Sequence, residues 1–364
     1  MKHVLRCLPL LCMLTAPCAG AVPAVAAAVP AEDPRMLLER GYYRRAAALC
    51  EQRLTVDRAD AQAGSVLSRV RGEQGRYDEA IQLAEAAAAA APRNADVQYS
   101  LSEAYGRKAG AVGVFKAAGL AGKMRKAADA ALAIDPRHLD ALEIVVRFHM
   151  LAPGFMGGDR KRAAEFVERL TQVDAARGWL QKGQNALRVK DTTLAAQCYA
   201  HAAEVTPPSG EALVRYASWL APRWRDPARS EQFALQAAAL EPWRAGAWQV
   251  LASLYAYEER WTDLDDVLRR SEAAEPLHLS AWYQAARQLV VTRKDPARAE
   301  SYLRHYLTRD PEIGSPSWSA AHWRLGQALE QQGRRTEAIA ELESAVKLDP
   351  KLDDARKDLK RLRG

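Results

Sequence analysis

One spaced set of residues recurs along most of this chain, and the recurrence constrains the fold more than any other feature. Residues 245–276 show it best: an aromatic residue, a leucine, a small residue and a second aromatic residue, then two leucines and a proline. These residues are Trp248, Leu251, Ala252, Tyr255, Leu264, Leu268 and Pro276. A single helical hairpin cannot bury its apolar face, whereas hairpins stacked in tandem bury a continuous one. The recurrence therefore predicts an array of stacked helical hairpins.

The array is predicted to span residues 34–350 of the 364-residue chain. The expected repeats are residues 34–58, 61–92, 95–136, 137–175, 176–207, 211–242, 245–276, 280–311 and 319–350. The third and fourth repeats carry irregular inserts at 106–123 and 152–159, of which the first is expected to be a lengthened loop or a bent helix. A charged amphipathic segment, 351–364, follows the array and is predicted to cap it, because an exposed array end needs a polar outer face.

The spacing resembles the tetratricopeptide repeat family over about residues 34–364. Frequent alanine and sparse β-branched residues independently favour helix. The resemblance implies an all-α, right-handed superhelical solenoid of about eight to nine helix-turn-helix repeats with a C-terminal capping helix. It also implies that the first helix of each repeat lines a concave face. Residues 105–163 further resemble a subset of exported bacterial repeat proteins.

The first 26 residues have the pattern of a secretory signal peptide. Lys2 and Arg6 give a basic start, and an apolar stretch from Leu8 to Leu14 follows. Two small-residue cleavage sites end the segment, Ala19-x-Ala21 and Ala24-x-Ala26. Residues 27–33 are an Ala/Pro-rich linker. The pattern predicts a periplasmic or secreted protein.

Two alternatives to cleavage remain open at this stage. The leader could stay uncleaved as an anchor, or Cys18 could carry lipid, although Pro17 before it fits a lipobox poorly. Membrane contact is expected only in these cases. Apart from the leader cysteines, the chain has Cys50 and Cys198, which lie in distant repeats and are predicted to be buried thiols without a disulfide.

No motif in the sequence indicates catalysis, a cofactor or a metal site. The glycine-rich stretch before Lys123 has Ala117 and Met124 where a phosphate loop needs Gly and Ser or Thr. The histidines lack the spacing of a helical zinc site, and no nucleophile elbow is present. We therefore expect no enzymatic activity and no cofactor. An enzyme would need an active site hidden in the two inserts.

The aromatic residues divide between core and candidate groove. Trp179, Trp248 and Tyr283 occupy the first aromatic position of the repeat and are predicted to pack between helices. Trp219 and Trp323 fall where the first helices of the repeats are expected to face the groove.

Positions on the first helices define a candidate partner-binding groove that is rich in arginine in its middle. The residues expected to carry binding are Arg107, Arg147, Arg177, Arg188, Arg215, Trp219, Arg223, Tyr257 and Trp323. Further groove positions in the C-terminal repeats are Gln249, Ser253, Gln284, Gln288 and Gln327. Guanidinium groups bind carboxylates through a planar fork, and aromatic side chains supply contact area at low entropic cost. The alternative is that these arginines only solvate a concave face.

The sequence thus predicts a non-enzymatic protein–protein interaction scaffold of the bacterial cell envelope. The partner is expected to be a protein or peptide, with a preference for acidic segments because of the arginines. Nucleic acid and small-molecule substrates are not expected. The Lys/Asn carboxylate clamp of chaperone-binding repeat proteins is absent, since no groove position carries Asn. An envelope-anchored assembly subunit is the alternative function.

Overall fold

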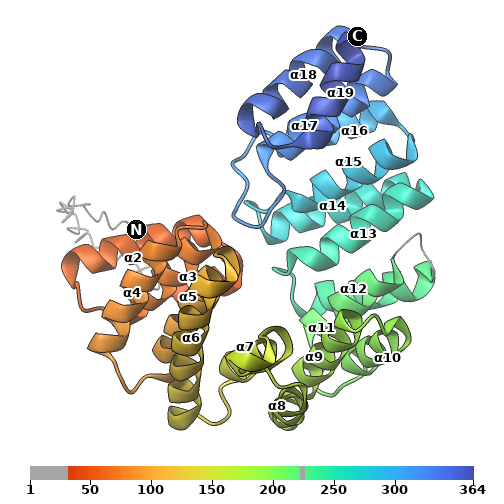
Figure 1. Cartoon of the computed structure of the whole chain (residues 1–364). Helices are drawn as coiled ribbons and strands as arrows, with labels where there is room; N and C mark the ends of the chain where they lie inside the picture. Colours follow the sequence, from red (N-terminus) through yellow and green to blue (C-terminus); the bar gives the residue numbers. More distant parts are fainter. Residues whose placement is uncertain (1–31, 222–225) are drawn as a thin grey trace, which may run out of the picture. The chain divides into compact units, whose positions relative to one another are not determined.

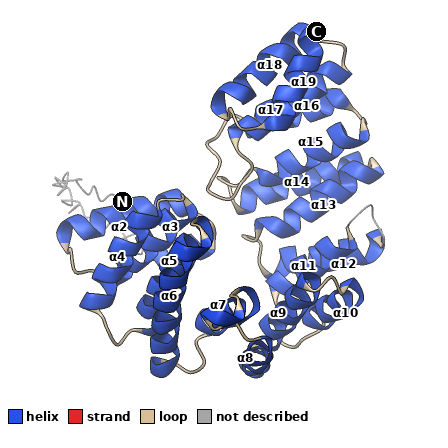
Figure 2. Cartoon of the chain, viewed as in Figure 1, coloured by secondary structure: helices blue, strands red, loops and turns tan. Residues whose placement is uncertain are grey.

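The computed structural model describes residues 32–221 and 226–364, and every regular element in these residues is a helix (Figure 2). The first elements are α1 (Pro34–Glu39), α2 (Tyr43–Val56), α3 (Ala61–Glu73), α4 (Tyr77–Ala90), α5 (Ala95–Ala111), α6 (Val114–Ile134), α7 (Leu139–Leu151), the 3-10 helix η1 (Gly154–Met156), α8 (Arg160–Val173), α9 (Ala175–Arg188) and α10 (Thr192–Ala203). The remaining helices are α11 (Gly210–Leu220), α12 (Pro227–Leu240), α13 (Ala245–Glu258), α14 (Trp261–Ala274), α15 (Ser280–Thr292), α16 (Pro296–Tyr306), α17 (Trp318–Gln331), α18 (Arg335–Leu348) and α19 (Asp353–Arg363).

Neighbours in sequence are neighbours in space throughout residues 34–364. Each helix packs against the next one along the chain, and several odd-numbered helices also contact the next odd-numbered helix, as in α13 with α15 (Figure 1). The predicted all-α helical repeat fold is confirmed. None of the described helices is both long enough and apolar enough to cross a lipid bilayer.

Short polar side chains begin many of the helices. Asp60 and Asn94 accept hydrogen bonds from the backbone N–H groups of Ala63 and Val97, at 2.9 and 3.3 Å. Such caps satisfy backbone donors that the first helical turn leaves without a partner. The connections between helices can therefore be short, which holds each helix against its neighbour.

Several turns between paired helices require a left-handed backbone. Gly75 and Gly333 supply it at φ 76° and 77°, and glycine adopts this conformation without steric cost. Lys190 and Glu259 take the same conformation, at φ 64° and 59°, although they carry a Cβ. A side chain there costs roughly 1–2 kcal/mol, so these two turns are held by the packing of the helices around them.

Small residues allow the helices of a pair to approach closely. Ala46, Ala80, Ala195 and Ala338 on the second helices are fully buried. A Cβ built on Gly183 in α9 would lie 2.5 Å from Cε1 of Tyr199 in α10, so only glycine fits there. Close packing of this kind explains why alanine is used so heavily in this chain.

Two of the three aromatic residues predicted to pack between helices are fully buried. Trp248 and Tyr283 are buried, and Nε1–H of Trp248 donates to the Pro242 carbonyl at 2.7 Å. Trp179 is only half-buried and packs against the His201 ring, with a centroid distance of 4.8 Å. Cys50 and Cys198 are buried, as predicted.

The insert at 106–123 is helical, so of the two predicted alternatives, a lengthened loop or a bent helix, the loop is excluded. α5 continues to Ala111 and α6 begins at Val114, which leaves only Val112 and Gly113 between them. The insert therefore lengthens both helices of the pair, because its alanine content favours helix over loop.

The insert at 152–159 is an irregular connection, as predicted. α7 ends at Leu151, and Gly157 after η1 has φ 92°. A Cβ on Gly158 would lie 1.7 Å from the Ala152 carbonyl oxygen, so the chain folds back tightly on the end of α7. The predicted signal peptide (1–26), most of the linker (27–33) and Arg223 lie outside the described residues.

Candidate partner-binding groove

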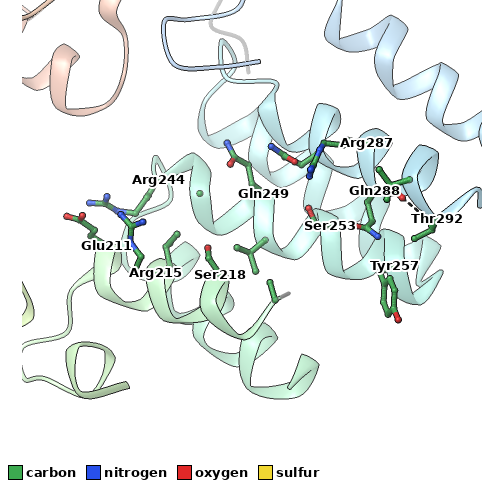
Figure 3. A pocket seen from close by; sticks show the side chains of 16 residues that line it. Glu211, Arg215, Ser218, Arg244, Gln249, Ser253, Tyr257, Arg287, Gln288 and Thr292 are labelled. Atoms are coloured by element: carbon green, nitrogen blue, oxygen red, sulfur yellow. Dashed lines mark hydrogen bonds between the residues drawn. The ribbon is translucent and has the colours of Figure 1, made fainter. Parts of the chain in front are cut away.

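A groove of about 900 Å³ runs along the first helices of three successive pairs, α11, α13 and α15 (Figure 3). α13 lies close to α11 because Gly246 has no side chain: a Cβ there would lie 2.9 Å from Cγ1 of Val214. Val214, Val250 and Val291 supply apolar surface to the lining. The remaining lining residues are mostly polar, so the groove suits a segment with both apolar and hydrogen-bonding groups.

One end of the groove is basic. Arg215 and Arg244 lie there beside Glu211 (Figure 3). Arg244 forms an ion pair with Glu241 at the end of the preceding helix. The Arg215 side chain is exposed and has no ion-pair or hydrogen-bond partner among the described residues. Its guanidinium group is therefore available to a carboxylate from outside.

Amide and hydroxyl side chains dominate the middle of the groove. Gln249 donates to Oγ of Ser280 at 2.8 Å. The Thr292 hydroxyl donates to the Gln288 carbonyl at 2.8 Å (Figure 3). Gln284 and Ser253 line the same stretch. Amides both donate and accept, so this part of the groove can pair with the backbone of an extended segment.

Arg287 adds a further positive charge on α15. It lines the groove and has no ion-pair partner among the described residues. Tyr257 lies at the other end of α13, and Nζ of Lys294 stands 5.3 Å from the centroid of its ring. Arginines therefore line one end of the groove and its middle, while Lys294 near the other end pairs with Glu259.

Two of the residues predicted for the site line this groove, Arg215 and Tyr257. Arg107 and Arg177 instead have acidic partners within the protein. Arg107 lies 2.7 Å from a carboxylate oxygen of Glu103, and Arg177 lies 2.7 Å from one of Asp140. These ion pairs leave the two arginines less available to a partner than the sequence suggested.

Arg147 and Arg188 are exposed, and neither has an ion-pair partner among the described residues. They lie outside the lining of the groove on α11, α13 and α15. Arg147 instead borders a separate cavity beside α5 and α6. Arg223 falls in a stretch, 222–225, that the structure does not describe.

The two tryptophans predicted to face the groove have partners within the protein. Trp219 packs edge-on against Tyr199, at a centroid distance of 5.3 Å, and borders a small cavity beside α10. Trp323 donates Nε1–H to Oδ2 of Asp358 in α19 at 2.8 Å, and the Arg324 guanidinium lies 3.8 Å from its ring centroid. Contacts with neighbouring helices thus occupy both indoles.

Sequence reasoning missed Arg244 and Arg287. Arg287 stands three residues after the predicted groove residue Gln284, and residues three apart on a helix share a face. This three-residue spacing from Gln284 is a signal in the sequence that identifies Arg287. Arg244 precedes α13, in a turn that the helical spacing does not cover.

Glu143 on α7 has an unusual carboxyl group. Burial desolvates it and raises its pKa to about 7, while Arg177 opposes and Asp140 reinforces the change. Arg177 lies 3.5 Å from the carboxylate. The charge of this carboxyl group on α7 therefore changes near neutral pH.

The lining of the groove holds no pair of groups suited to general acid and base catalysis. Its described titratable residues are arginines, Glu211 and Tyr257. Among the residues that the structure describes, no cluster of three or more His, Cys, Asp or Glu side chains could hold a metal ion. The arrangement is suited to binding a polar, negatively charged segment.

Comparisons with known proteins agree with the helical pairs. A family model described as tetratricopeptide repeat matches residues 66–136 and 288–353. No curated protein matches the chain.

Several solved structures are similar in fold. Yeast Tom70 is 12% identical over 91% of this chain and 86% of its own, with a TM-score of 0.48. A thermophilic TPR protein of Thermus thermophilus is 22% identical over 51% of this chain and 95% of its own, with a TM-score of 0.45. PilW, a type IV pilus biogenesis factor, is 18% identical over 61% of this chain and 98% of its own, with a TM-score of 0.45.

The recurring spacing, the stacked helical pairs and the two matched segments lead to one conclusion. The chain carries tetratricopeptide repeats at residues 66–136 and 288–353, a fold that suggests a protein–protein interaction scaffold.

Proposed function

We propose that this protein is a non-enzymatic scaffold that binds an extended, acidic segment of a partner protein in the groove along α11, α13 and α15. The observation that carries the proposal is the charge of the lining: three arginines, Arg215, Arg244 and Arg287, accompany one carboxylate, Glu211. Two of these arginines, Arg215 and Arg287, have no ion-pair partner among the described residues, so a partner's carboxylates would supply the missing charge.

The other lining residues suit a peptide backbone. Gln249, Gln284 and Gln288 offer donors and acceptors along the groove, and the valines offer apolar surface. Interfaces gain specificity and association rate from complementary charge, while apolar contacts add affinity. The arginines would therefore select the partner, and the valines and amides would hold it.

The test is fluorescence anisotropy with labelled twelve-residue peptides of matched apolar content that differ only in carrying Glu, Gln or Lys at alternate positions. The Glu peptide is expected to bind best. Added salt should weaken its binding, because salt screens exposed charge pairs. The double variant Arg215→Glu with Arg287→Glu should lower its affinity about tenfold or more, since every 1.4 kcal/mol is tenfold.

Arg188→Glu is the matched control, because Arg188 is an exposed arginine outside the groove lining. It changes the net charge in the same direction but should leave most of the binding intact. Equal loss in the control and the double variant would show a non-specific charge effect and would reject the groove. Equal binding of the three peptides would also reject it.

We further propose that the protein acts in the bacterial cell envelope. The support is the basic start, apolar stretch and small-residue cleavage sites of residues 1–26. Cell fractionation with N-terminal sequencing tests this. A soluble periplasmic form that starts near residue 22 or 27 is expected. A full-length form extracted only by detergent would instead favour the envelope-anchored assembly subunit.

A further inference from the structure

The two irregular inserts meet at one apolar cavity of about 580 Å³. The end of α5 and the start of α6 form one side of it, and the end of α7 with η1 forms the other. The repeat pattern requires neither insert. This cavity is separate from the groove on α11, α13 and α15. Its lining is mostly apolar, whereas that of the groove is mostly polar.

Small residues leave the cavity open. Ala109 and Gly110 of α5 and Ala117 of α6 line it, and a Cβ built on Gly110 would meet no atom within 4 Å. A Cβ at Gly183 in the α9–α10 pair would instead lie 2.5 Å from the Tyr199 ring. The small residues of the insert therefore leave space beside α5 and α6.

The walls are apolar and adaptable. Met124 and Met156 face the cavity with Phe148, and methionine side chains adjust to ligands of irregular shape. Leu151 lines the cavity and is 59% exposed, while the neighbouring Phe155 is 83% exposed. Exposed apolar side chains at the edge of an apolar cavity favour an apolar ligand.

The described polar side chains of the lining are two arginines, Arg107 and Arg147. Glu103 and Glu73 already pair with Arg107. Arg147 is exposed and has no hydrogen-bond or ion-pair partner among the described residues. One available cation therefore stands beside an apolar space.

This combination excludes acid–base catalysis by the described lining. Arginine stays protonated in proteins, and the described lining residues include no carboxylate, imidazole, thiol or hydroxyl. A peptide is also a poor occupant, because its backbone N–H and C=O groups would find few partners on these walls.

We propose that the cavity binds an amphiphile with a single alkyl chain and one anionic head group, of the kind of a medium-chain fatty acid. The chain would lie between α5, α6 and α7 against Met124 and Phe148, and the head group would pair with Arg147. This ligand lies beyond the protein partner that the sequence predicts, and the proposal does not depend on the groove.

Isothermal titration calorimetry with decanoate tests the proposal on the full chain. Decyl sulfate tests a different anionic head group, decyltrimethylammonium a cationic one, and short-chain butyrate the contribution of the alkyl chain. Decanoate and decyl sulfate are expected to bind with one site, decyltrimethylammonium at least tenfold more weakly, and butyrate not measurably.

Gly110→Trp is designed to fill the cavity, and Ala117→Phe does so from the facing helix. Each should lower decanoate affinity at least tenfold. Gly122→Trp is the control, since Gly122 is an exposed residue of α6 outside the lining and a Cβ there also meets no atom within 4 Å. Arg147→Gln should weaken decanoate severalfold while leaving the melting temperature nearly unchanged.

Three outcomes would overturn the proposal. Full decanoate binding by both folded cavity variants would place the ligand elsewhere. Equal affinity for decanoate and decyltrimethylammonium would remove the role of Arg147. Binding to anionic phosphatidylglycerol vesicles without binding to monomeric decanoate would indicate a membrane surface and not a cavity.

Discussion

The indole Nε1–H of Trp323 donates a hydrogen bond to Oδ2 of Asp358 at 2.8 Å, and this bond joins α17 to the terminal helix α19. Gln327 donates to the same oxygen, also at 2.8 Å. The sequence predicted that Trp323 faces the groove, but its indole is bonded to the terminal helix. The terminal helix packs there, so the indole serves the end of the array.

Asp358→Ala should therefore loosen α19. Burial alone would raise the pKa of Asp358, but hydrogen bonds from Trp323 and Gln327 and the pairing with Arg361 lower it overall. A carboxyl group with a lowered pKa stabilises the fold above its ordinary pKa, and this contribution is lost as the pH falls. The variant should melt at a lower temperature at pH 7, with a smaller difference at pH 3, as measured by circular dichroism.

Asp354→Ala is the matched control, because Asp354 lies on the same helix and its ion-pair partner among the described residues is the exposed Lys357. It should change stability by less than about 0.5 kcal/mol, as exposed ion pairs do. An equal loss of stability in both variants would mean that helix charge, and not the bond to Trp323, holds α19.

Glu143→Gln should make stability less dependent on pH between about 4.5 and 7. The pKa of Glu143 is raised to about 7, so its contribution is fully present below the ordinary pKa of glutamate and is lost as the pH rises through 7. At pH 8.5 the variant should be more stable, by on the order of 1 kcal/mol, because exposure of over a third of the side chain reduces the effect.

The measurement is thermal unfolding at pH 5 and pH 8.5, with the exposed Glu165→Gln as control. A variant that is destabilised at both pH values would show that the ion pair of Glu143 with Arg177 outweighs the cost of desolvation.

Gly183→Ala should destabilise the protein by roughly 1–3 kcal/mol, the usual cost of overpacking. Its new methyl group would lie 2.5 Å from the ring of Tyr199, which is buried and has no room to move. Gly119→Ala in α6 should have the opposite effect, of about 0.5–1 kcal/mol, because no atom lies within 4 Å and alanine favours helix. Urea unfolding of the two variants checks the contrast in sign.

Lys190→Gly should stabilise the turn after α9. Lys190 has φ 64°, where a Cβ is strained and glycine is not. Glycine also gives the unfolded chain more conformational entropy, which offsets part of the relieved strain. The free energy of unfolding should therefore rise by about 0.5 kcal/mol. Lys190→Ala, measured beside it by urea unfolding, should give no such gain because it keeps the Cβ.

The class of fold followed from sequence because a repeat protein is built from local contacts. The residues around Trp248 and Tyr283 recur at fixed spacing, and each helix packs mainly against its neighbours in the chain. Local spacing is visible in sequence, and so were the buried thiols Cys50 and Cys198.

The candidate site depended on contacts that spacing does not contain. Helix position identified Arg215 and Tyr257 as groove residues, but ion pairing of Arg177 and the bond from Trp323 to Asp358 became visible only in three dimensions. The cavity between the two inserts also became visible only in three dimensions, because residues of α5, α6 and α7 line it together. Sequence by itself determined the repeating helical pair, because that unit is stabilised within a short stretch of chain. Tertiary structure alone decided which arginines remain available, because a side chain's charge is satisfied by whichever partner the packing brings within reach.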